Sequence, residues 1–397
     1  MPNSILTPTA VTREALRILH QKLNFIGTIN RAYDDSFAKS GARIGDALKI
    51  RLPNQYTVTT GATLSTQDTT ESSVELKVAT QKHVGLNFTS TDLTLHLDDF
   101  SKRVLDPAMS VLAASIEADA LSMTKDVYNL VDGDAAALAF THILSGRKTL
   151  NNNLAPMDNS RSAMLSTEHS AKLVDSLKGL FQDSEAIRKQ YKEGMMGRTA
   201  GFDFYENTHV SDHTTGTAVK ATGYLSNGVD QIGSSIAVDS ATTTFKKGDV
   251  ITFAGVKRVH PETKTDTGAL QQFVITADYA GGAGNIAISP GVVATGAKQN
   301  VTNAIADNSA VTKIGAAASE LLNGSMVYHK DAFTFATADL IMPSGTHFAG
   351  RDVMDGISLR IIRDYDINND KFPCRVDVLY GFKTIRPELA CRVHADG

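Results

Sequence analysis

Residues 46–58 read DALKIRLPNQYTV and residues 73–88 read SVELKVATQKHVGLNF, and these two stretches decide the fold. In both of them apolar and polar residues alternate with period two, which is the pattern of a β-strand with one buried face. We predict a long two-stranded ribbon over residues 46–88, whose Thr-rich middle forms a polar tip. Its apolar face carries Leu48, Ile50, Leu52, Val74, Leu76, Val78 and Leu86.

The apolar face of such a ribbon has to be covered, because an isolated two-stranded ribbon is only marginally stable in water. Fully extended, residues 46–58 alone would span about 43 Å at about 3.3 Å per residue. Two interpretations are open at this point. The ribbon is either an ordinary hairpin packed on the body of its own chain, or an extension that lies on a neighbouring subunit.

A long helix is predicted to follow the ribbon, within residues 96–131. Asp106 is a good N-cap, and Pro107 is tolerated at the first helical position because its missing N–H is not needed there. Apolar residues then recur every three or four positions, as on one face of a helix. The core-facing side of this spine helix carries Met109, Leu112, Ile116 and Met123.

The segment that precedes the ribbon, residues 1–45, contains a shorter amphipathic stretch from Val11 to Ile26. Its apolar residues are spaced by three, four and five positions, which is compatible with one face of a helix. Because prolines precede this stretch, we predict an N-terminal arm that docks onto something else.

The second half of the chain changes in texture. Residues 132–215 mix helical and strand patterns, and residues 317–397 return to strands. Between them, residues 216–316 are rich in Gly and contain short β-type runs separated by turn signals. These runs are residues 236–238, 250–259, 273–277 and 286–288. We predict an inserted all-β domain, a small barrel, because exposed loops tolerate insertions.

The composition excludes several classes of protein. Of the 397 residues, 42% are hydrophobic and 21% are charged, as in a globular protein of more than one domain. The net charge of −4 argues against tight nucleic-acid binding, which needs an excess of cationic side chains. Two cysteines cannot build a disulfide framework, and no signal peptide or long apolar run is recognisable. We expect a soluble protein of a reducing cytoplasm with no membrane partner.

No catalytic constellation is recognisable, so we predict no catalytic residue, no cofactor and no metal. His209, Asp212 and His213 have the spacing of metal ligands on a helix, but the surrounding Thr and Gly residues favour a strand or loop. Residues 364–370 resemble the start of a calcium loop and are better interpreted as a solvated turn. Cys374 and Cys391 are predicted to be buried fillers.

Four short patches, in this order along the chain, resemble a known family. They are AGFD at 200–203, GD at 248–249 with FAGVK at 253–257, FAG at 348–350, and YG at 380–381 with RPE at 386–388. Together with the order of arm, ribbon, long helix, mixed domain, β insertion and returning strands, they resemble the tailed-phage major capsid proteins with the Hong Kong ninety-seven fold. The inserted barrel narrows the resemblance to the P-twenty-two-like coat proteins of short-tailed phages.

The resemblance implies an α+β fold of six segments. These are an arm (1–45), an extended ribbon loop (46–95), a spine helix (96–131), the first part of a peripheral and axial domain (132–215), an inserted β-barrel (216–316), and the remaining axial and peripheral strands (317–397). It also implies a structural protein rather than an enzyme. Copies would assemble through hexamers and pentamers, with the ribbon at their contacts, into the icosahedral capsid of a virion.

The resemblance further implies partners for this assembly. A scaffolding protein and a portal would act with it in the cytoplasm of a host bacterium, and packaged double-stranded DNA would touch the inner face non-specifically. The family's insertion domain carries a long acidic loop that reaches a neighbouring capsomer. Here the corresponding residues 226–235 are fewer and carry only Asp230, which puts a salt-bridging role of this loop in doubt.

Three alternatives of other kinds stay open. The first is an encapsulin-like nanocompartment shell that encloses a cargo enzyme. The second is a metal-dependent hydrolase that uses His209, Asp212 and His213. The third is an adhesive or tail-structure protein built around the β module.

Overall fold

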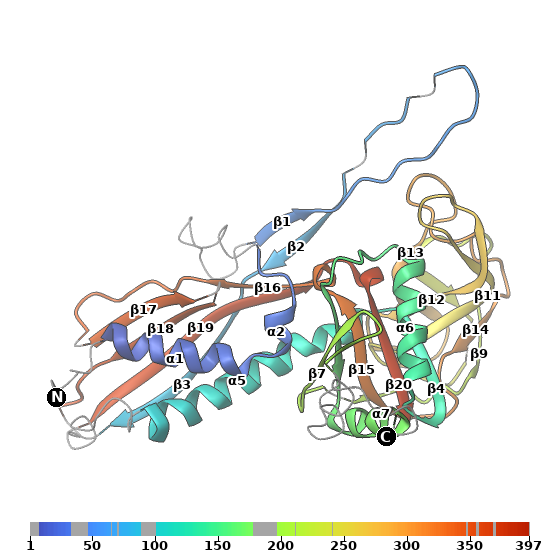
Figure 1. The fold of residues 1–397 in the computed structure, drawn as a ribbon. Coiled ribbons are helices and arrows are strands. Elements are labelled where there is room, and N and C mark those ends of the chain that lie inside the picture. The colour runs from blue at the N-terminus through green and yellow to red at the C-terminus, as the bar shows by residue number, and fades with distance from the viewer. Residues whose placement is uncertain are drawn as a thin grey trace, which may run out of the picture. The chain divides into compact units, whose positions relative to one another are not determined.

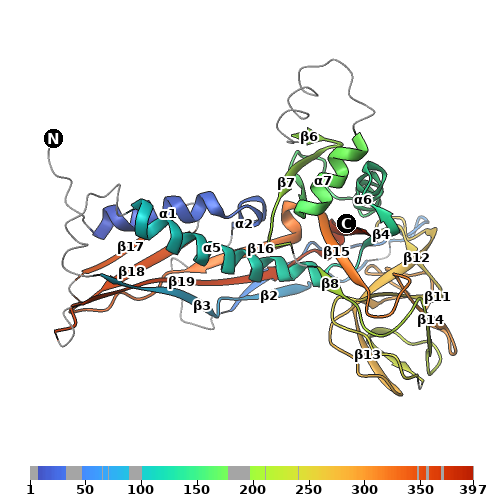
Figure 2. The same cartoon turned by 90° about the horizontal axis from the view of Figure 1, so that it is seen from below.

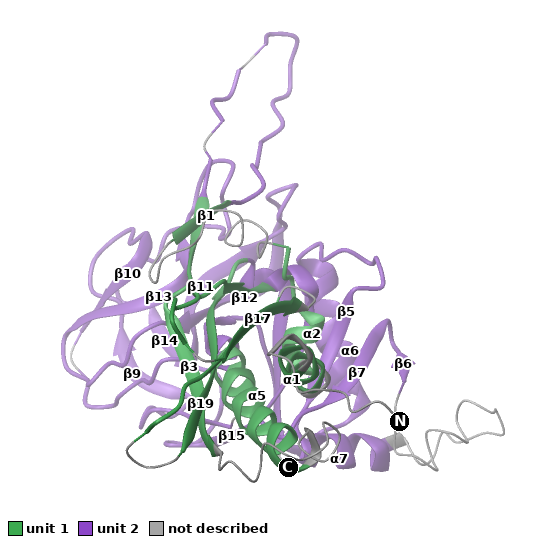
Figure 3. Cartoon of the chain, turned by 90° about the vertical axis from the view of Figure 1, so that its left-hand side faces the viewer, with its two compact units in different colours: residues 1–50, 73–121, 333–385 green, residues 51–72, 122–332, 386–397 purple. Residues whose placement is uncertain are grey.

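The structure is a computed structural model of the 397-residue chain. It describes residues 8–32, 47–64, 66–69, 71–88, 101–177, 197–210, 212–239, 241–346, 348–354, 357–367 and 371–396 (Figure 1). The chain divides into two compact units (Figure 3). Unit 1 comprises residues 1–50, 73–121 and 333–385, and unit 2 comprises residues 51–72, 122–332 and 386–397.

Unit 1 is built on an antiparallel sheet of five strands. Their bounds are β3 (Thr80–Phe88), β16 (Phe333–Ala338), β17 (Phe348–Met354), β18 (Ile357–Arg363) and β19 (Phe372–Thr384). The order is β16-β19-β18-β17, and β3 pairs with β19 over nine residues, from Thr80 opposite Tyr380 to Phe88 opposite Phe372. The long strand β19 therefore holds together segments that lie almost 300 residues apart in the sequence.

Helices cover one face of this sheet (Figure 2). They are α1 (Pro8–Lys22), the short α2 (Phe25–Thr28), the π-helical turn η2 (Ser101–Leu105) and α5 (Asp106–Leu121). The predicted apolar stripe of α5 is buried, since Met109, Leu112 and Ile116 are at most 2% exposed. Burial of such a stripe against the sheet stabilises the helix far more than its intrinsic propensity does.

The described part of the predicted N-terminal arm packs on its own unit, whereas the extreme N-terminus, residues 1–7, lies outside the described residues and its docking stays a prediction. Helix α1 packs on β17, β18 and α5 of its own unit. The apolar side chains of the amphipathic stretch, Val11, Leu16, Leu19, Leu23 and Ile26, are between 0% and 6% exposed. This chain therefore already covers them, while residues 33–45 of the predicted arm lie outside the described residues.

The predicted ribbon is much shorter than residues 46–88. Only β1 (Ala47–Arg51) and β2 (Ser73–Lys77) pair with each other, and the described residues between them form no strand. The chain then leaves the ribbon, and Leu86 lies on β3 in the sheet of unit 1. At this corner a Cβ on Gly381 of β19 would lie 2.0 Å from the carbonyl oxygen of Lys77, so only glycine allows the backbones to approach.

The spine helix is also shorter than predicted. Helix α5 ends at Leu121, a 3-10 turn η3 (Ser122–Asp126) follows, and β4 (Leu130–Ala137) begins where the helix was expected to continue. The reason is that the residues after η3 form hydrogen bonds with β20 in the sheet of unit 2. The Asn129 side chain donates to the carbonyl oxygen of Ala390 at 2.9 Å, and the Arg392 N–H donates to the carbonyl oxygen of Asn129 at 2.9 Å. Met123, 2% exposed, is thus buried on η3 rather than on α5.

Unit 2 contains a mixed seven-stranded sheet of order β4-β20-β15-β5-β7-β6, with β8 also paired to β15. Besides β4, its strands are β5 (Arg161–Leu165), β6 (Arg198–Thr199), β7 (Phe202–Glu206), β8 (His213–Thr214), β15 (Leu321–His329) and β20 (Ala390–Asp396). Helix α6 (Phe140–Asn152) packs on β4, β15 and β20, and α7 (Thr167–Leu177) packs on β5. The 3-10 turns η5 (Lys330–Ala332) and η6 (Pro387–Leu389) complete the described elements of this part.

The remaining strands of unit 2 form a closed barrel whose strands all lie between residues 216 and 316. They are β9 (Ala221–Leu225), β10 (Gly233–Val238), β11 (Val250–Val259), β12 (Asp266–Ile275), β13 (Gly284–Val292) and β14 (Ala310–Lys313), in the order β10-β13-β12-β11-β14-β9. A bridge between Ser226 and Val238 joins β9 to β10, so the sheet has no free edge there. The predicted strand at 250–259 is confirmed to the residue as β11.

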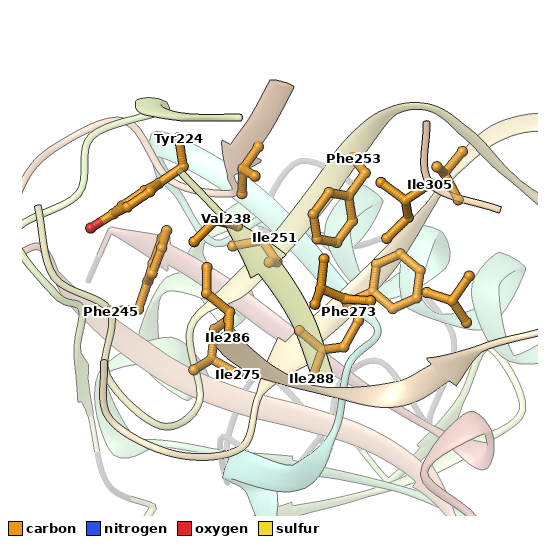
Figure 4. Close-up of a cluster of buried hydrophobic side chains, with 14 of the residues drawn as sticks. Tyr224, Val238, Phe245, Ile251, Phe253, Phe273, Ile275, Ile286, Ile288 and Ile305 are labelled. Atoms are coloured by element: carbon orange, nitrogen blue, oxygen red, sulfur yellow. The ribbon is translucent and has the colours of Figure 1, made fainter. Parts of the chain in front are cut away.

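The barrel has a core of its own (Figure 4). Sixteen buried hydrophobic residues between Ala218 and Val311 pack together, and at its centre Phe253 meets Phe273 edge to face at 5.6 Å. No described helix of the chain has the length and apolar character needed to cross a membrane.

Because this core is self-contained, residues 216–316 expressed alone should fold into a β-rich domain. Phe253→Ala should lower the free energy of unfolding of this fragment by about 3–5 kcal/mol, since Phe253 is fully buried. Urea unfolding followed by far-UV circular dichroism measures this change. The exposed Val229, 77% accessible, offers the matched control Val229→Ala, which should shift the midpoint little. A disordered spectrum of the unsubstituted fragment would show that the barrel needs the rest of the chain.

Candidate functional site

Between β1 and β2, the described residues within 52–72 form a loop that exposes three large apolar side chains to solvent. Val58 is 95% exposed, Leu64 is 86% exposed and Tyr56 is 57% exposed. One backbone hydrogen bond, from Leu52 N–H to the Ser72 carbonyl at 2.8 Å, closes the base of this loop. Three large apolar side chains exposed on one loop present a surface suited to a protein partner.

The ribbon residues predicted to contact a neighbouring subunit divide into two groups. Ile50, Leu76 and Val78 are 4%, 0% and 0% exposed, so for these three the prediction is wrong, because their own chain already buries them. The other predicted residues keep a partly exposed surface, and their contact with a neighbour stays a prediction. They are Leu48, Leu52, Val74 and Leu86.

A second exposed apolar tip lies between β9 and β10 and contains Asp230, the predicted loop residue of the insertion domain. Val229 is 77% exposed and Ile232 is 64% exposed, and Asp230 between them has the left-handed φ of +51°. Gln231 pairs with Ile305 through both backbone groups, at 3.0 and 3.1 Å, which holds this loop against the barrel. The tip therefore presents two aliphatic side chains on either side of Asp230, and the Asp307 carboxylate accepts from the Gly228 N–H beside them at 2.8 Å.

Within unit 2, the barrel is fastened to the seven-stranded sheet by an apolar cluster and a side-chain bridge. Tyr128 and Leu130 from the sheet side pack with Val250 and Val274 of the barrel. The Gln272 side chain accepts from the Leu130 N–H at 2.8 Å and donates to the Leu130 carbonyl at 2.9 Å. Residues 142 positions apart in the sequence are thus joined as if they were strand neighbours.

Asp249 is the polar centre of this junction. Its carboxylate is 1% exposed and accepts from Gly216 N–H at 3.0 Å, from Lys246 N–H at 2.9 Å and from His213 Nε2 at 2.7 Å. A buried carboxylate is tolerated only with such a full set of donors. Nearby, Lys313 is also fully buried and donates to the Thr215 hydroxyl at 3.1 Å and to the Ala317 carbonyl at 2.7 Å.

The structure does not bring the predicted metal ligands together. His213 is buried and bound to Asp249, whereas His209 and Asp212 are exposed on the loop before β8. Among the described residues there is no group of three or more His, Cys, Asp or Glu side chains that could hold a metal ion. The i, i+4 spacing misled because the segment is a turn followed by a strand, not a helix.

Two further ionisable side chains, Arg392 and His394, are buried on one face of β20. Within the described part of the chain, Arg392 Nε and Nη2 and His394 Nδ1 have no hydrogen-bond partner. Burial lowers the pKa of the Arg392 guanidinium to about 10, against the opposing pull of Asp249. Burial, with the nearby Arg392 and His213, holds the pKa of His394 well below its usual value.

His169 of α7 is buried as well. Its Nε2 donates to the Ala395 carbonyl at 3.2 Å, because a carbonyl can only accept, and its Nδ1 then accepts from the Ser325 hydroxyl at 2.7 Å. Burial lowers the pKa of His169, so that the neutral ring is the stable form. The folded subunit therefore holds at least two histidines uncharged near neutral pH.

Both cysteines are buried, as predicted, one in each unit. Cys374 on β19 is 8% exposed, and burial raises the pKa of its thiol to about 11. Cys391 on β20 is fully buried, and burial raises the pKa of its thiol to about 12. In both cases burial outweighs a nearby arginine that lowers the thiol pKa, Arg363 for Cys374 and Arg392 for Cys391, so neither thiol is an activated nucleophile. Of the predicted turn at 364–370, residues 368–370 lie outside the described residues.

Sequence reasoning missed Asp249 and Gln272 as junction residues. Asp249 stands in a Lys-Gly-Asp turn, where an Asp that bonds nearby backbone N–H groups is ordinary. No local signal marks Gln272, because its partner is 142 residues away.

These buried histidines predict an acid-sensitive subunit. Below a pH of about 6.5 the unfolded chain binds protons that the folded chain excludes from His394 and His169, so the free energy of unfolding should fall as the pH falls. The limiting slope is about 1.4 kcal/mol per pH unit for each histidine. Urea unfolding between pH 7.5 and 5.5, followed by circular dichroism because the chain has no Trp, measures it.

His394→Leu should flatten this pH dependence, whereas the same substitution at the exposed His209 should leave it unchanged. Parallel curves for His394→Leu and the wild type would contradict the assignment.

Comparison with solved structures shows what the fold is similar to. A structure from Mycobacterium phage Che8 is similar with a TM-score of 0.51 at 12% identity, over 94% of this chain and 90% of that one. The capsid structure of cyanophage P-SCSP1u gives 0.45 at 12% identity, over 88% and 84% of the two chains. The capsid of Ralstonia phage GP4 gives 0.44 at 8% identity, over 92% and 86%. The predicted α+β fold of the Hong Kong ninety-seven type is thus confirmed.

Comparison at the level of sequence gives a more specific result. The search among curated proteins finds no matching relative. A family model described as the P22 coat protein, gene protein 5, matches residues 28–392. The match spans most of the chain, and the protein therefore belongs to the P22 coat protein family, the major capsid proteins of bacteriophages.

Proposed function

We propose that this chain builds an icosahedral capsid by assembling with copies of itself, through hexamers and pentamers. The observation that carries the proposal is the loop at 52–72, on which Val58, Leu64 and Tyr56 are exposed while Ile50 of β1 and Leu76 of β2 beside it are buried. A loop of this kind docks on a neighbouring copy in a heterologous contact, and such contacts close into rings. The family supports this, because a coat protein's lateral partners are other copies.

The remaining features of the proposal concern assembly. A scaffolding protein directs a precursor shell in the host cytoplasm, a portal occupies one vertex, and double-stranded DNA is then packaged while the shell expands. The net charge of −4 supports a container that does not grip DNA by releasing counterions. The second of the exposed tips, at Val229 and Ile232, offers an additional apolar contact between subunits.

The experiment that tests the proposal measures particle size. The full chain is expressed with and without a candidate scaffolding protein and studied by sedimentation and negative-stain electron microscopy. Closed shells of uniform diameter support the capsid, and dependence on the scaffold separates a phage capsid from a self-sufficient nanocompartment. A small oligomer under every condition would contradict the proposal.

Val58→Asp should reduce the yield of closed shells at least about tenfold, because a charge would have to be desolvated in the contact. The free subunit should fold as before, since Val58 is 95% exposed. Sedimentation of equal amounts of protein measures both effects.

The matched control is Thr60→Asp, which places the same charge on an exposed polar position of the same loop and should assemble. Leu76→Asp should instead prevent folding of unit 1, because Leu76 is fully buried. If Val58→Asp forms normal shells, the loop at 52–72 takes no part in the contact between subunits.

A further inference from the structure

Gln67 joins the two sides of the loop at 52–72 through the backbone of a single residue, Thr57. Its Oε1 accepts from the Thr57 N–H at 2.9 Å and from the Thr57 hydroxyl at 3.1 Å, and its Nε2 donates to the Thr57 carbonyl at 2.5 Å. A side-chain amide carries one acceptor and one donor group in the same arrangement as a peptide unit. Gln67 therefore makes to Thr57 the pair of hydrogen bonds that two facing strand residues exchange.

The position of this clip follows the register of the ribbon below it. The Leu52 N–H donates to the Ser72 carbonyl at the base of the loop. Thr57 lies five residues after Leu52, and Gln67 lies five residues before Ser72. Thr57 and Gln67 therefore face each other in the same register as Leu52 and Ser72. The described residues between these two contacts form no strand, and the Gln67 side chain fills the space between the two backbones.

The same device occurs at two other places in the described chain, both of them partly buried. Gln231 accepts from the Ala237 N–H at 2.6 Å and donates to the Ala237 carbonyl at 3.0 Å. Gln272 bonds both backbone groups of Leu130, as described for the junction of barrel and sheet. Both partners lie on paired strands, Ala237 opposite Asn285 of β13 and Leu130 opposite Arg392 of β20, and the glutamine adds two hydrogen bonds to this backbone. This recurrence indicates that the contact at Thr57 is a structural clip and not a chance contact of an exposed side chain.

The clip lies among the exposed apolar side chains. Tyr56 and Val58 flank Thr57, and in an extended chain their side chains point to the face opposite that of Thr57. Fixing the Thr57 backbone therefore fixes the direction of both neighbours. Other cross-loop contacts are weaker, since the Arg51–Glu71 pair is 3.4 Å apart and more than half exposed, and the hydroxyls of Tyr56 and Thr69 lie 3.5 Å apart.

We propose that Gln67 is a positioning residue for assembly: its clip on Thr57 orders the loop in the free subunit, so that Tyr56 and Val58 are presented ready to dock on a second copy. This rests on the proposed shell function, which it deepens. A loop ordered in advance loses less conformational entropy on docking than a loose one, and the contact is correspondingly tighter. Gln67 itself need not touch the neighbouring copy.

The test compares Gln67→Ala with Thr66→Ala in the full chain. Thr66 is the exposed neighbour of Gln67 and its side chain makes no hydrogen bond within the described part of the chain, so its substitution controls for any change in loop composition. Hydrogen exchange of the Thr57 amide in the unassembled subunit reads the clip directly. Gln67→Ala should speed this exchange at least about fivefold, because one protecting hydrogen bond is lost, while the melting temperature stays unchanged.

Assembly is then measured as the protein concentration at which shells first appear in the presence of scaffold. Gln67→Ala should raise this concentration about fivefold or more, and Thr66→Ala should leave both readouts at wild-type values. Unchanged exchange at Thr57 would show that the clip does not form. Faster exchange with unchanged assembly would show that the clip does not serve docking. If the wild type forms no shells at all, the proposed function falls as well, whereas a failure confined to Gln67→Ala overturns only the role of Gln67.

Discussion

The pairing of β3 with β19 is the interaction on which unit 1 depends. It joins the segment that leaves the ribbon to a strand almost 300 residues later, over nine consecutive residue pairs. At its start Gly381 allows the backbone of Lys77 to come close, which no residue with a Cβ could do. Side chains then fasten the spine helix to the same two strands, since Asp119 of α5 accepts from Lys82 at 2.7 Å and from the Tyr380 hydroxyl at 2.5 Å. Asp377, fully buried on β19, is held by Arg360 and Arg375.

Local patterns in the sequence predicted whether a segment is a helix or a strand. They failed where a partner far away in the sequence determines which strands pair or where a helix ends. Period two in residues 73–88 correctly indicated strands, but it could not show that β3 pairs with β19 rather than with β1. Helical periodicity through Val127 and Leu130 was real, yet the sheet of unit 2 captures Asn129 and ends the helix earlier. The barrel strand at 250–259 was predictable because its glycine turns and apolar run are local signals. For the candidate site, the period-two pattern includes both Val58 and Leu76, so periodicity alone could not show that Val58 is exposed and Leu76 is buried.

The junction between the barrel and the seven-stranded sheet shows a different use of polar groups. Asp249, Lys313, Arg392 and His394 are all at most 3% exposed, although replacement by apolar residues would often be as stable. Of these, Asp249 and Lys313 are satisfied by one particular arrangement of hydrogen-bond partners, which defines how the inserted domain is seated on its host sheet. The same reasoning applies to the side-chain amide of Gln272. Its two hydrogen bonds to the backbone of Leu130 require a defined direction and length, which an apolar contact does not. Precise seating matters in a subunit whose small errors would be repeated at every position of a closed shell.

The two buried thiols have a practical consequence for anyone who wishes to decorate the particle. Cys374 and Cys391 are the only cysteines of the chain, and burial raises the pKa of both well above neutrality. A maleimide reacts with the thiolate of an accessible cysteine, so the native thiols are poor targets under mild conditions. A cysteine introduced at an exposed position outside the proposed contacts, such as Glu262, would then be a single addressable handle on each subunit, for a dye, a glycan or a peptide antigen. The natural chain is in this sense already prepared for site-selective conjugation, with no native residue to remove first.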